Sequence, residues 1–291
     1  MKMIKYFLLL FTFFIFCSSV YAKENTIDLS KSKWQYIWGD STFSDNMPDI
    51  IKNSEKYNWQ NIEYPSNPDG RGENQNIWFR VKIPQNLPDQ SFFYTLSMDI
   101  NAQVYLKDQL LYEFGKINID GKGDYIGWPW HMFSLPKDSE GEYLYFRLYS
   151  DYIDIGFFGD ILITSKGVIY EKFLDKDIPK LMVSAISIFV SLLFIISFLI
   201  NIKRTELLIL GTLFLTQGVN VLLNVKILQI YFYYPLFCQY VSAFAFFYFP
   251  VGMAMFMDKC IDLKTPFNII RRVWQVHLSY LLIAMIGSVI G

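Results

Sequence analysis

Residues 181–202 read LMVSAISIFVSLLFIISFLINI, a run without a single charged side chain. An α-helix rises 1.5 Å per residue, so about 20 residues cross the hydrocarbon core of a bilayer. The runs over residues 207–225 and 236–257 are also long and uncharged, whereas a helix of a water-soluble protein would carry a polar face. These three runs predict transmembrane helices.

A fourth apolar run begins near Val276 and is still apolar at Gly291. Because a full span needs about 20 residues, we expect this helix, over residues 276–291, to be cut short. The predicted transmembrane region covers residues 178–291.

The N-terminal segment has the pattern of a secretory signal peptide. Two lysines precede the apolar run Tyr6–Phe16, and small residues follow up to Ala22. This pattern predicts a signal peptide over residues 1–22, cleaved after Ala22. An uncleaved anchor stays open as an alternative. A lipid anchor on Cys17 is disfavoured because a bulky phenylalanine precedes it.

The charges divide the chain into two parts. The formal net charge is −1, but residues 23–180 hold 17 basic and 24 acidic side chains, and the remaining segments hold 9 basic and 3 acidic ones. An acidic block between apolar, weakly basic segments is typical of a membrane protein with one extramembrane domain. The 53% hydrophobic content excludes intrinsic disorder. The lack of a basic excess disfavours nucleic acid as a partner.

The basic residues between the apolar runs predict an orientation. If residues 23–177 are exported, the first helix runs inward, and six basic residues then lie on the cytoplasmic side against one outside. This distribution obeys the positive-inside rule. We therefore expect a multi-pass protein of the cytoplasmic membrane with an extracytoplasmic domain. The inner residues are Lys203, Arg204, Lys259, Lys264, Arg271 and Arg272, and the outer one is Lys226.

Residues 23–177 read as an all-β domain. Short runs of β-branched and aromatic residues alternate with turn residues, as in an antiparallel sandwich or barrel. The block contains no cysteine, so its aromatic core must stabilise it without disulfides. We expect Trp34, Trp38, Trp59 and Trp78 to lie in strands and in the core. The predicted strands are Trp78–Ile83, Phe92–Met98, Gln103–Leu111, Tyr143–Ser150 and Asp160–Thr164.

Several of these segments resemble a known fold. Trp34-Gln35-Tyr36-Ile37-Trp38-Gly39, then Trp59-Gln60, then Trp78-Phe79-Arg80 resemble the galactose-binding-like jelly roll that opens family-two glycosidases. Gln103-Val104-Tyr105-Leu106 and Phe114-Gly115 resemble its strand–turn segment, with Lys107-Asp108 where Asn-Gly is common. With the helices behind it, the chain resembles the bacterial seven-transmembrane receptors with diverse intracellular signalling modules. The resemblance implies a jelly-roll sensor ahead of a helix bundle.

Signatures of catalysis are scarce. The sequence has no Gly-x-Ser-x-Gly, no His-Glu-x-x-His, no phosphate-binding glycine loop and no Cys-x-x-Cys. His131 and His277 are the only histidines, too few for a histidine-rich metal site. The glycosidase resemblance implies no catalysis, because the catalytic carboxylates of those enzymes lie in another domain. We expect neither enzyme activity, nor a metal, nor a cofactor.

One loop combines glycines, aromatic rings and charges. Asp120, Asp124, Trp128, Trp130 and His131 fall within twelve residues and are the candidate ligand-binding residues. Aromatic faces stack on sugars, and carboxylates bind hydroxyl groups. The alternative, which the sequence leaves open, is that Trp128 and Trp130 close the sandwich core. Two carboxylates at this spacing are weak evidence for calcium.

The second apolar run carries a polar face. Gln217, Asn220 and Asn224 recur at helical spacing, and amides in hydrocarbon seek partners, so we expect this face to point into the helix bundle. Ser184, Ser187 and Ser191 repeat the spacing in the first run. Helix packing explains both patterns more simply than a conduction path does.

Together these features predict a membrane receptor. Its exported domain would bind a small molecule, with carbohydrate as the leading class, and relay binding through the junction Lys172–Lys180 to an intracellular signalling module absent from this chain. Two alternatives are a tethered carbohydrate-binding or structural module without signalling, and part of a transporter. The expected partners are the ligand, the lipid bilayer, and a second copy or a signalling partner.

Overall fold

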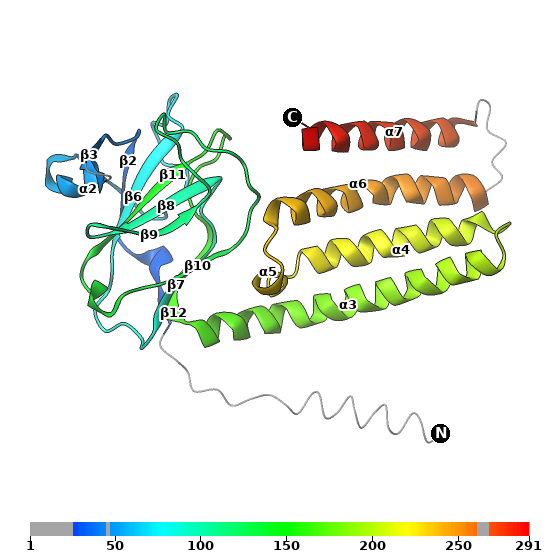
Figure 1. Ribbon diagram of the computed structural model, residues 1–291, viewed down its shortest axis with the longest axis horizontal. Helices are drawn as coiled ribbons and strands as arrows, with labels where there is room; N and C mark the ends of the chain where they lie inside the picture. Colours follow the sequence, from blue (N-terminus) through cyan, green and yellow to red (C-terminus); the bar gives the residue numbers. More distant parts are fainter. Residues whose placement is uncertain (1–25, 45–46, 261–267, 291) are drawn as a thin grey trace, which may run out of the picture.

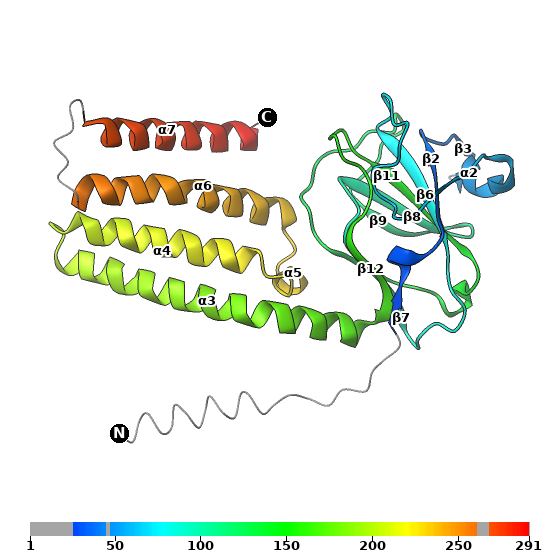
Figure 2. The ribbon, with the colours of Figure 1, turned by 180° about the vertical axis from the view of Figure 1, so that it is seen from behind.

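The computed structural model describes residues 26–44, 47–260 and 268–290. The predicted signal peptide and the loop with Lys264 lie outside these residues. Within them, a β domain occupies one end of a set of long helices (Figures 1 and 2). All pairings between its strands are antiparallel.

Two sheets form the body of the β domain, and a small hairpin flanks them. The four-stranded sheet has the order β1-β12-β7-β10, and the six-stranded sheet has the order β5-β2-β6-β11-β8-β9. The first sheet consists of β1 (Ile27–Asp28), β12 (Phe158–Ser165), β7 (Ser91–Ser97) and β10 (His131–Ser134). The second consists of β5 (Gln60–Ile62), β2 (Trp34–Trp38), β6 (Asn76–Lys82), β11 (Tyr143–Tyr149), β8 (Asn101–Leu106) and β9 (Gln109–Phe114). Beside them lie β3 (Phe43–Ser44), β4 (Met47–Pro48) and the short helix α2 (Asp49–Lys52).

The core lies between the two sheets and is largely aromatic. The Trp34 ring lies 5.1 Å from that of Phe157 and 5.6 Å from that of Phe146, centroid to centroid. The indole Nε1 of Trp34 donates to the Leu29 carbonyl at 2.7 Å, so this buried polar atom is satisfied. Fully burying a large apolar side chain contributes about 1.5–3 kcal/mol. The core thus supplies the stability that disulfides provide in many exported domains.

The predicted strands coincide with observed ones, with two differences. The run Gln103–Leu111 is not one strand but the hairpin β8–β9, and its two-residue turn places Lys107 at φ +51°. Trp59 precedes β5 rather than lying in a strand, and it packs against Tyr145 and the Arg80 guanidinium. Trp34 and Trp78 are fully buried, as expected, and Trp38 is half-buried.

Among the described residues, four helices are long and apolar enough to span a membrane. They pack in sequence, α3 on α4, α4 on α6 and α6 on α7 (Figure 1). Two of them differ from the predicted bounds: α3 begins fifteen residues before Leu181, and α7 seven before Val276. Their bounds are α3 (Lys166–Ile200), α4 (Thr205–Leu223), α6 (Pro235–Cys260) and α7 (Ile269–Ile290), and the single turn α5 (Leu228–Tyr231) joins α4 to α6.

The first part of α3 belongs to the β domain as much as to the helices. Ile169 and Phe173 are buried against Tyr94 and Leu162 on the outer face of the four-stranded sheet. The expected junction Lys172–Lys180 is therefore helical, and Pro179 lies inside α3. One continuous helix runs from the sheet into the apolar region.

Small residues bring α3 and α4 close together. The Ser184 hydroxyl donates to the Gly218 carbonyl at 2.8 Å, and the Ser191 hydroxyl donates to the Gly211 carbonyl at 2.7 Å. Both serines are buried, whereas Ser187 is only half-buried. Serine–backbone bonds between closely packed helices are a feature of helix association in membranes. The serine spacing therefore serves packing.

Candidate functional site at the junction of the β domain and the helices

The loop between β9 and β10 carries Trp130 to the helices. Its indole ring packs on Phe173 of α3, with centroids 4.8 Å apart, and lies 6.3 Å from the Tyr94 ring. The indole Nε1 donates to the main-chain carbonyl of Lys226 at 2.9 Å. Trp130 therefore contacts the sheet, α3 and the connector between α4 and α6 at once.

Gln229 of the connector pairs with the main chain of Trp130 in both directions. The Gln229 Nε2 donates to the Trp130 carbonyl at 2.7 Å, and the Trp130 N–H donates to Gln229 Oε1 at 2.9 Å. A side-chain amide that pairs with both the N–H and the C=O of one residue, as a neighbouring strand would, fixes the position and the orientation of that main-chain segment. We call the segment 225–231 the connector, and these two bonds the Trp130–Gln229 pair.

A buried carboxylate on α3 holds the connector from the other side. Asp177 is fully buried, and its Oδ2 accepts from the Ile227 N–H at 2.9 Å while its Oδ1 accepts from Lys180 Nζ at 3.2 Å. Lys226 lies beside it, with its ammonium 3.4 Å from the Tyr94 hydroxyl and 5.7 Å from the Phe173 ring centroid. Burial lowers the pKa of Lys226, because a low-dielectric site disfavours the ammonium form.

The same loop also reaches the start of α6. Gly127 has φ +99°, and a Cβ at this position would lie 2.6 Å from the Leu236 nitrogen and 2.7 Å from the Pro235 carbonyl carbon. Only glycine fits both the conformation and the close backbone approach. Two residues before Gly127, the Tyr125 hydroxyl donates a hydrogen bond to Gln239 Oε1 of α6. The β domain is thus attached to α3, the connector and α6.

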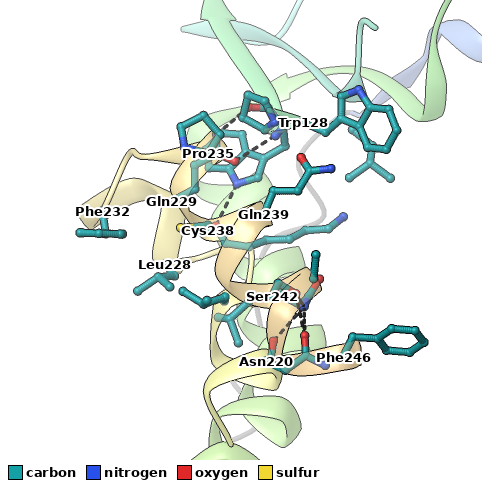
Figure 3. Close-up of a pocket in the computed structure, with 18 of the residues that line it drawn as sticks. Trp128, Asn220, Leu228, Gln229, Phe232, Pro235, Cys238, Gln239, Ser242 and Phe246 are labelled. Atoms are coloured by element: carbon teal, nitrogen blue, oxygen red, sulfur yellow. Dashed lines mark hydrogen bonds between the residues drawn. The ribbon is translucent and has the colours of Figure 1, made fainter. Parts of the chain in front are cut away.

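These contacts surround a cavity of about 630 Å³, which we call the junction cavity. Trp128 lies at its β-domain end, and Asn220 and Phe246 lie at its other end (Figure 3). It is lined from the β domain by Leu96, Trp128, Pro129 and Trp130, from α4 and the connector by Asn220, Leu223, Asn224, Val225, Lys226, Leu228 and Gln229, and from residues 232–247 by Phe232, Pro235, Cys238, Gln239, Ser242, Ala243, Phe246 and Phe247.

A small polar cluster lies about one turn of α6 nearer to the β domain than Phe246. The Asn224 Nδ2 donates to the Ser242 hydroxyl at 2.9 Å, and that hydroxyl donates to Asn220 Oδ1 at 2.6 Å (Figure 3). The predicted polar face of α4 thus points toward α6 at these two positions. Gln217 does not line the cavity, and its side chain makes no hydrogen bond within the described residues. The amide nitrogens of Asn220 and Gln239 likewise have no partner there.

The loop candidates divide into three groups. Trp128 is 57% exposed at the cavity and Trp130 is half-buried beside it, so neither closes the core between the sheets. Asp120 and Asp124 are exposed and lie outside the cavity, although the Asp124 carbonyl accepts from the Asn101 amide at 3.0 Å. Across residues 26–44, 47–260 and 268–290, no group of three or more His, Cys, Asp and Glu side chains is placed to hold a metal.

His131 lies in the core of the β domain. It is 1% exposed, packs edge-on against Phe114, and its Nδ1 lies 3.0 Å from the Tyr112 hydroxyl. Burial lowers its pKa to about 3, so the imidazole is neutral at physiological pH. His131 does not face the junction cavity. His131 and Phe133 lie two residues apart in β10 and therefore share one face of the strand, so the sequence pattern predicts that His131 is buried with Phe133.

Sequence reasoning missed the residues that join the two parts. Gln229 and Lys226 lie in the short interval between two apolar runs, which gives no indication of a partner in the β domain. Asp177 had a usable signal, because Ile169, Phe173 and Asp177 repeat every fourth residue and share one helix face. The structure thus defines a β domain docked, through a polar junction, on α3, the connector and α6.

A comparison with protein-family models finds no match, and neither does a comparison with curated proteins. The solved structures to which the chain is similar include the following three glycosidases. The Parabacteroides merdae β-glucuronidase is 13% identical over 48% of this chain and 22% of that chain, with a TM-score of 0.32. The Faecalibacterium prausnitzii β-glucuronidase is 17% identical over 45% of this chain and 22% of that chain, with a TM-score of 0.31. The putative β-galactosidase of Bacteroides fragilis is 12% identical over 48% of this chain and 23% of that chain, with a TM-score of 0.34. The chain therefore spans less than a quarter of these enzymes, and at these TM-scores the likeness carries no argument about activity.

Proposed function

We propose that the chain is the sensing and membrane part of a receptor in the cytoplasmic membrane. Its β domain lies on the outer side, and α3, α4, α6 and α7 span the bilayer. The distribution of charge supports this orientation, because Lys203 and Arg204 lie in the α3–α4 turn, at the end of the helices away from the β domain (Figure 1). Arg271 and Arg272 lie at that end too, near the start of α7. Basic residues at the cytoplasmic end follow the positive-inside rule.

The β domain is proposed to be a galactose-binding-like jelly roll, as in the seven-transmembrane receptors that the sequence resembles. Two antiparallel sheets packed face to face support this proposal. In such receptors the signal passes to an intracellular module, so the proposed partner is a signalling module or a second copy of the chain.

The Trp130–Gln229 pair is the observation that carries the proposal. It joins the ligand-candidate loop to the connector, so a ligand that orders or moves the loop also acts on α4 and α6. The proposed ligand is a small neutral sugar. Trp128 offers an exposed ring, with Tyr125 and Tyr152 packed edge-on against it, and rings of this kind stack on sugars.

The experiment uses the full chain in lipid nanodiscs and a panel of neutral mono- and disaccharides. We expect at least one sugar to raise the unfolding temperature of the β domain and to slow amide exchange in residues 225–231. Binding without any change in the connector would favour a tethered carbohydrate-binding module. A panel with no stabilising sugar would refute carbohydrate sensing.

A further inference from the structure

The junction cavity extends well below the outer ends of the helices. Asn220 lies three residues before the end of α4, and Ser242 lies seven residues into α6. Phe246 and Phe247 lie eleven and twelve residues into α6, which at 1.5 Å per residue is roughly 17 Å along the helix. The hydrocarbon core of a bilayer is about 30 Å thick, so one leaflet accounts for about 15 Å of it. If the helices span as proposed, the cavity runs from the aqueous interface into the outer leaflet.

The wall of the cavity is mostly apolar and carries almost no charge. No carboxylate lines it, and the one charged lining residue, Lys226, is already engaged with Tyr94 and Phe173. The amide nitrogens of Asn220 and Gln239 have no partner within the described chain. Exposed Phe246 and Phe247 form an apolar side. Unpaired amide donors favour hydroxyl or carbonyl acceptors, and the lack of any carboxylate in the wall disfavours a cationic head.

We propose that the junction cavity binds a neutral single-chain amphiphile, whose hydroxyl- or carbonyl-bearing head meets the Asn220–Ser242 cluster and whose acyl chain lies along Phe246 and Phe247. The volume of about 630 Å³ is that of a site for one drug-sized molecule, so it suits a single chain rather than a two-chain phospholipid. This inference rests on the proposed membrane orientation. It adds a second ligand, which enters from the lipid and acts on the junction through which the sugar signal passes.

The test uses the full chain in nanodiscs that contain a diazirine-labelled monoacylglycerol. After illumination, mass spectrometry maps the labelled residues, with unlabelled monoacylglycerol as competitor. We expect competable labelling at Leu223, Phe246 and Phe247. The cavity-filling variant Ala243→Phe should reduce it at least tenfold. Ala284→Phe, on an exposed position of α7 away from the cavity, is the matched control and should leave it unchanged.

A second pair of variants tests the polar end. Asn220→Leu should weaken competition by monoacylglycerol about tenfold, whereas Gln217→Leu, one turn away and outside the cavity, should not change it. Labelling spread evenly over the helices and insensitive to Ala243→Phe would overturn the proposal, as would preferential labelling by an anionic fatty-acid probe. If sugar-dependent exchange in the connector persists in either case, only the amphiphile site fails and the receptor proposal stands.

Discussion

Replacing Gln229 with alanine removes both bonds of the Trp130–Gln229 pair and leaves the rest of the junction in place. A net hydrogen bond contributes about 0.5–1.5 kcal/mol, so the pair stabilises the docked state by about 1–3 kcal/mol. Since about 1.4 kcal/mol corresponds to a factor of ten, local opening should become about 5- to 150-fold more frequent. The contact between loop and connector should loosen while the β domain stays folded.

Hydrogen exchange read by mass spectrometry measures this opening in the full chain in nanodiscs. Residues 127–131 and 225–231 should exchange faster in Gln229→Ala, while strands β6 and β11 keep their protection. Gln217→Ala is the matched control, because this amide has no hydrogen-bond partner in the part of the chain that the structure describes. Equal exchange of the two segments in both variants would show that the pair does not hold the β domain on the helices.

Three further perturbations test other parts of the structure. In thermal unfolding, Gly127→Ala should be several kcal/mol more destabilising than Gly70→Ala. Both glycines have a positive φ, but only a Cβ at Gly127 would collide with backbone atoms. Equal effects of the two variants would exclude the close approach of the loop to α6. Asp177→Ala should lower the free energy of unfolding by about 2–3 kcal/mol in the same assay, because the buried hydrogen bond from the Ile227 N–H to the Asp177 carboxylate is lost. The Ile227 amide should then exchange faster with solvent. Unchanged protection of that amide would contradict this role of Asp177. The pKa of His131 is lowered to about 3, so folding favours the neutral imidazole and the stability falls as the pH drops below about 6.5. Between pH 7 and 4.5 the expected loss in the free energy of unfolding is about 2–3 kcal/mol, measured by urea unfolding. A His131→Gln variant with the same pH dependence would refute this role of His131.

Local patterns predicted most of the secondary structure. Short runs of β-branched and aromatic residues between turn residues identify β6, β7, β11 and β12, because such side chains favour strands. The length of the uncharged runs identifies α4 and α6 closely. The start of α3 was missed for a physical reason: its first turns pack on a sheet instead of in an apolar medium, so Lys166 to Lys180 show a mixed amphipathic pattern.

The site was predictable only in parts. The sequence singled out Trp128 and Trp130 in one segment and Asn220 and Asn224 in another, and the structure places all four on one cavity. No local pattern could join segments about 90 residues apart, since their contact depends on the tertiary fold. Asp120, Asp124 and His131 entered the candidate set because they share the loop.

Site-directed labelling tests the central proposal, an outer β domain on membrane-spanning helices, most directly. With the native cysteines replaced by serine, single cysteines are introduced by Asp108→Cys in the exposed β8–β9 turn and by Lys203→Cys in the exposed α3–α4 turn. Intact spheroplasts are then treated with a membrane-impermeant maleimide. The account predicts labelling of the Asp108→Cys variant in intact spheroplasts, and of the Lys203→Cys variant only after permeabilisation. Labelling of Lys203→Cys in intact spheroplasts, or protection of Asp108→Cys, would contradict it.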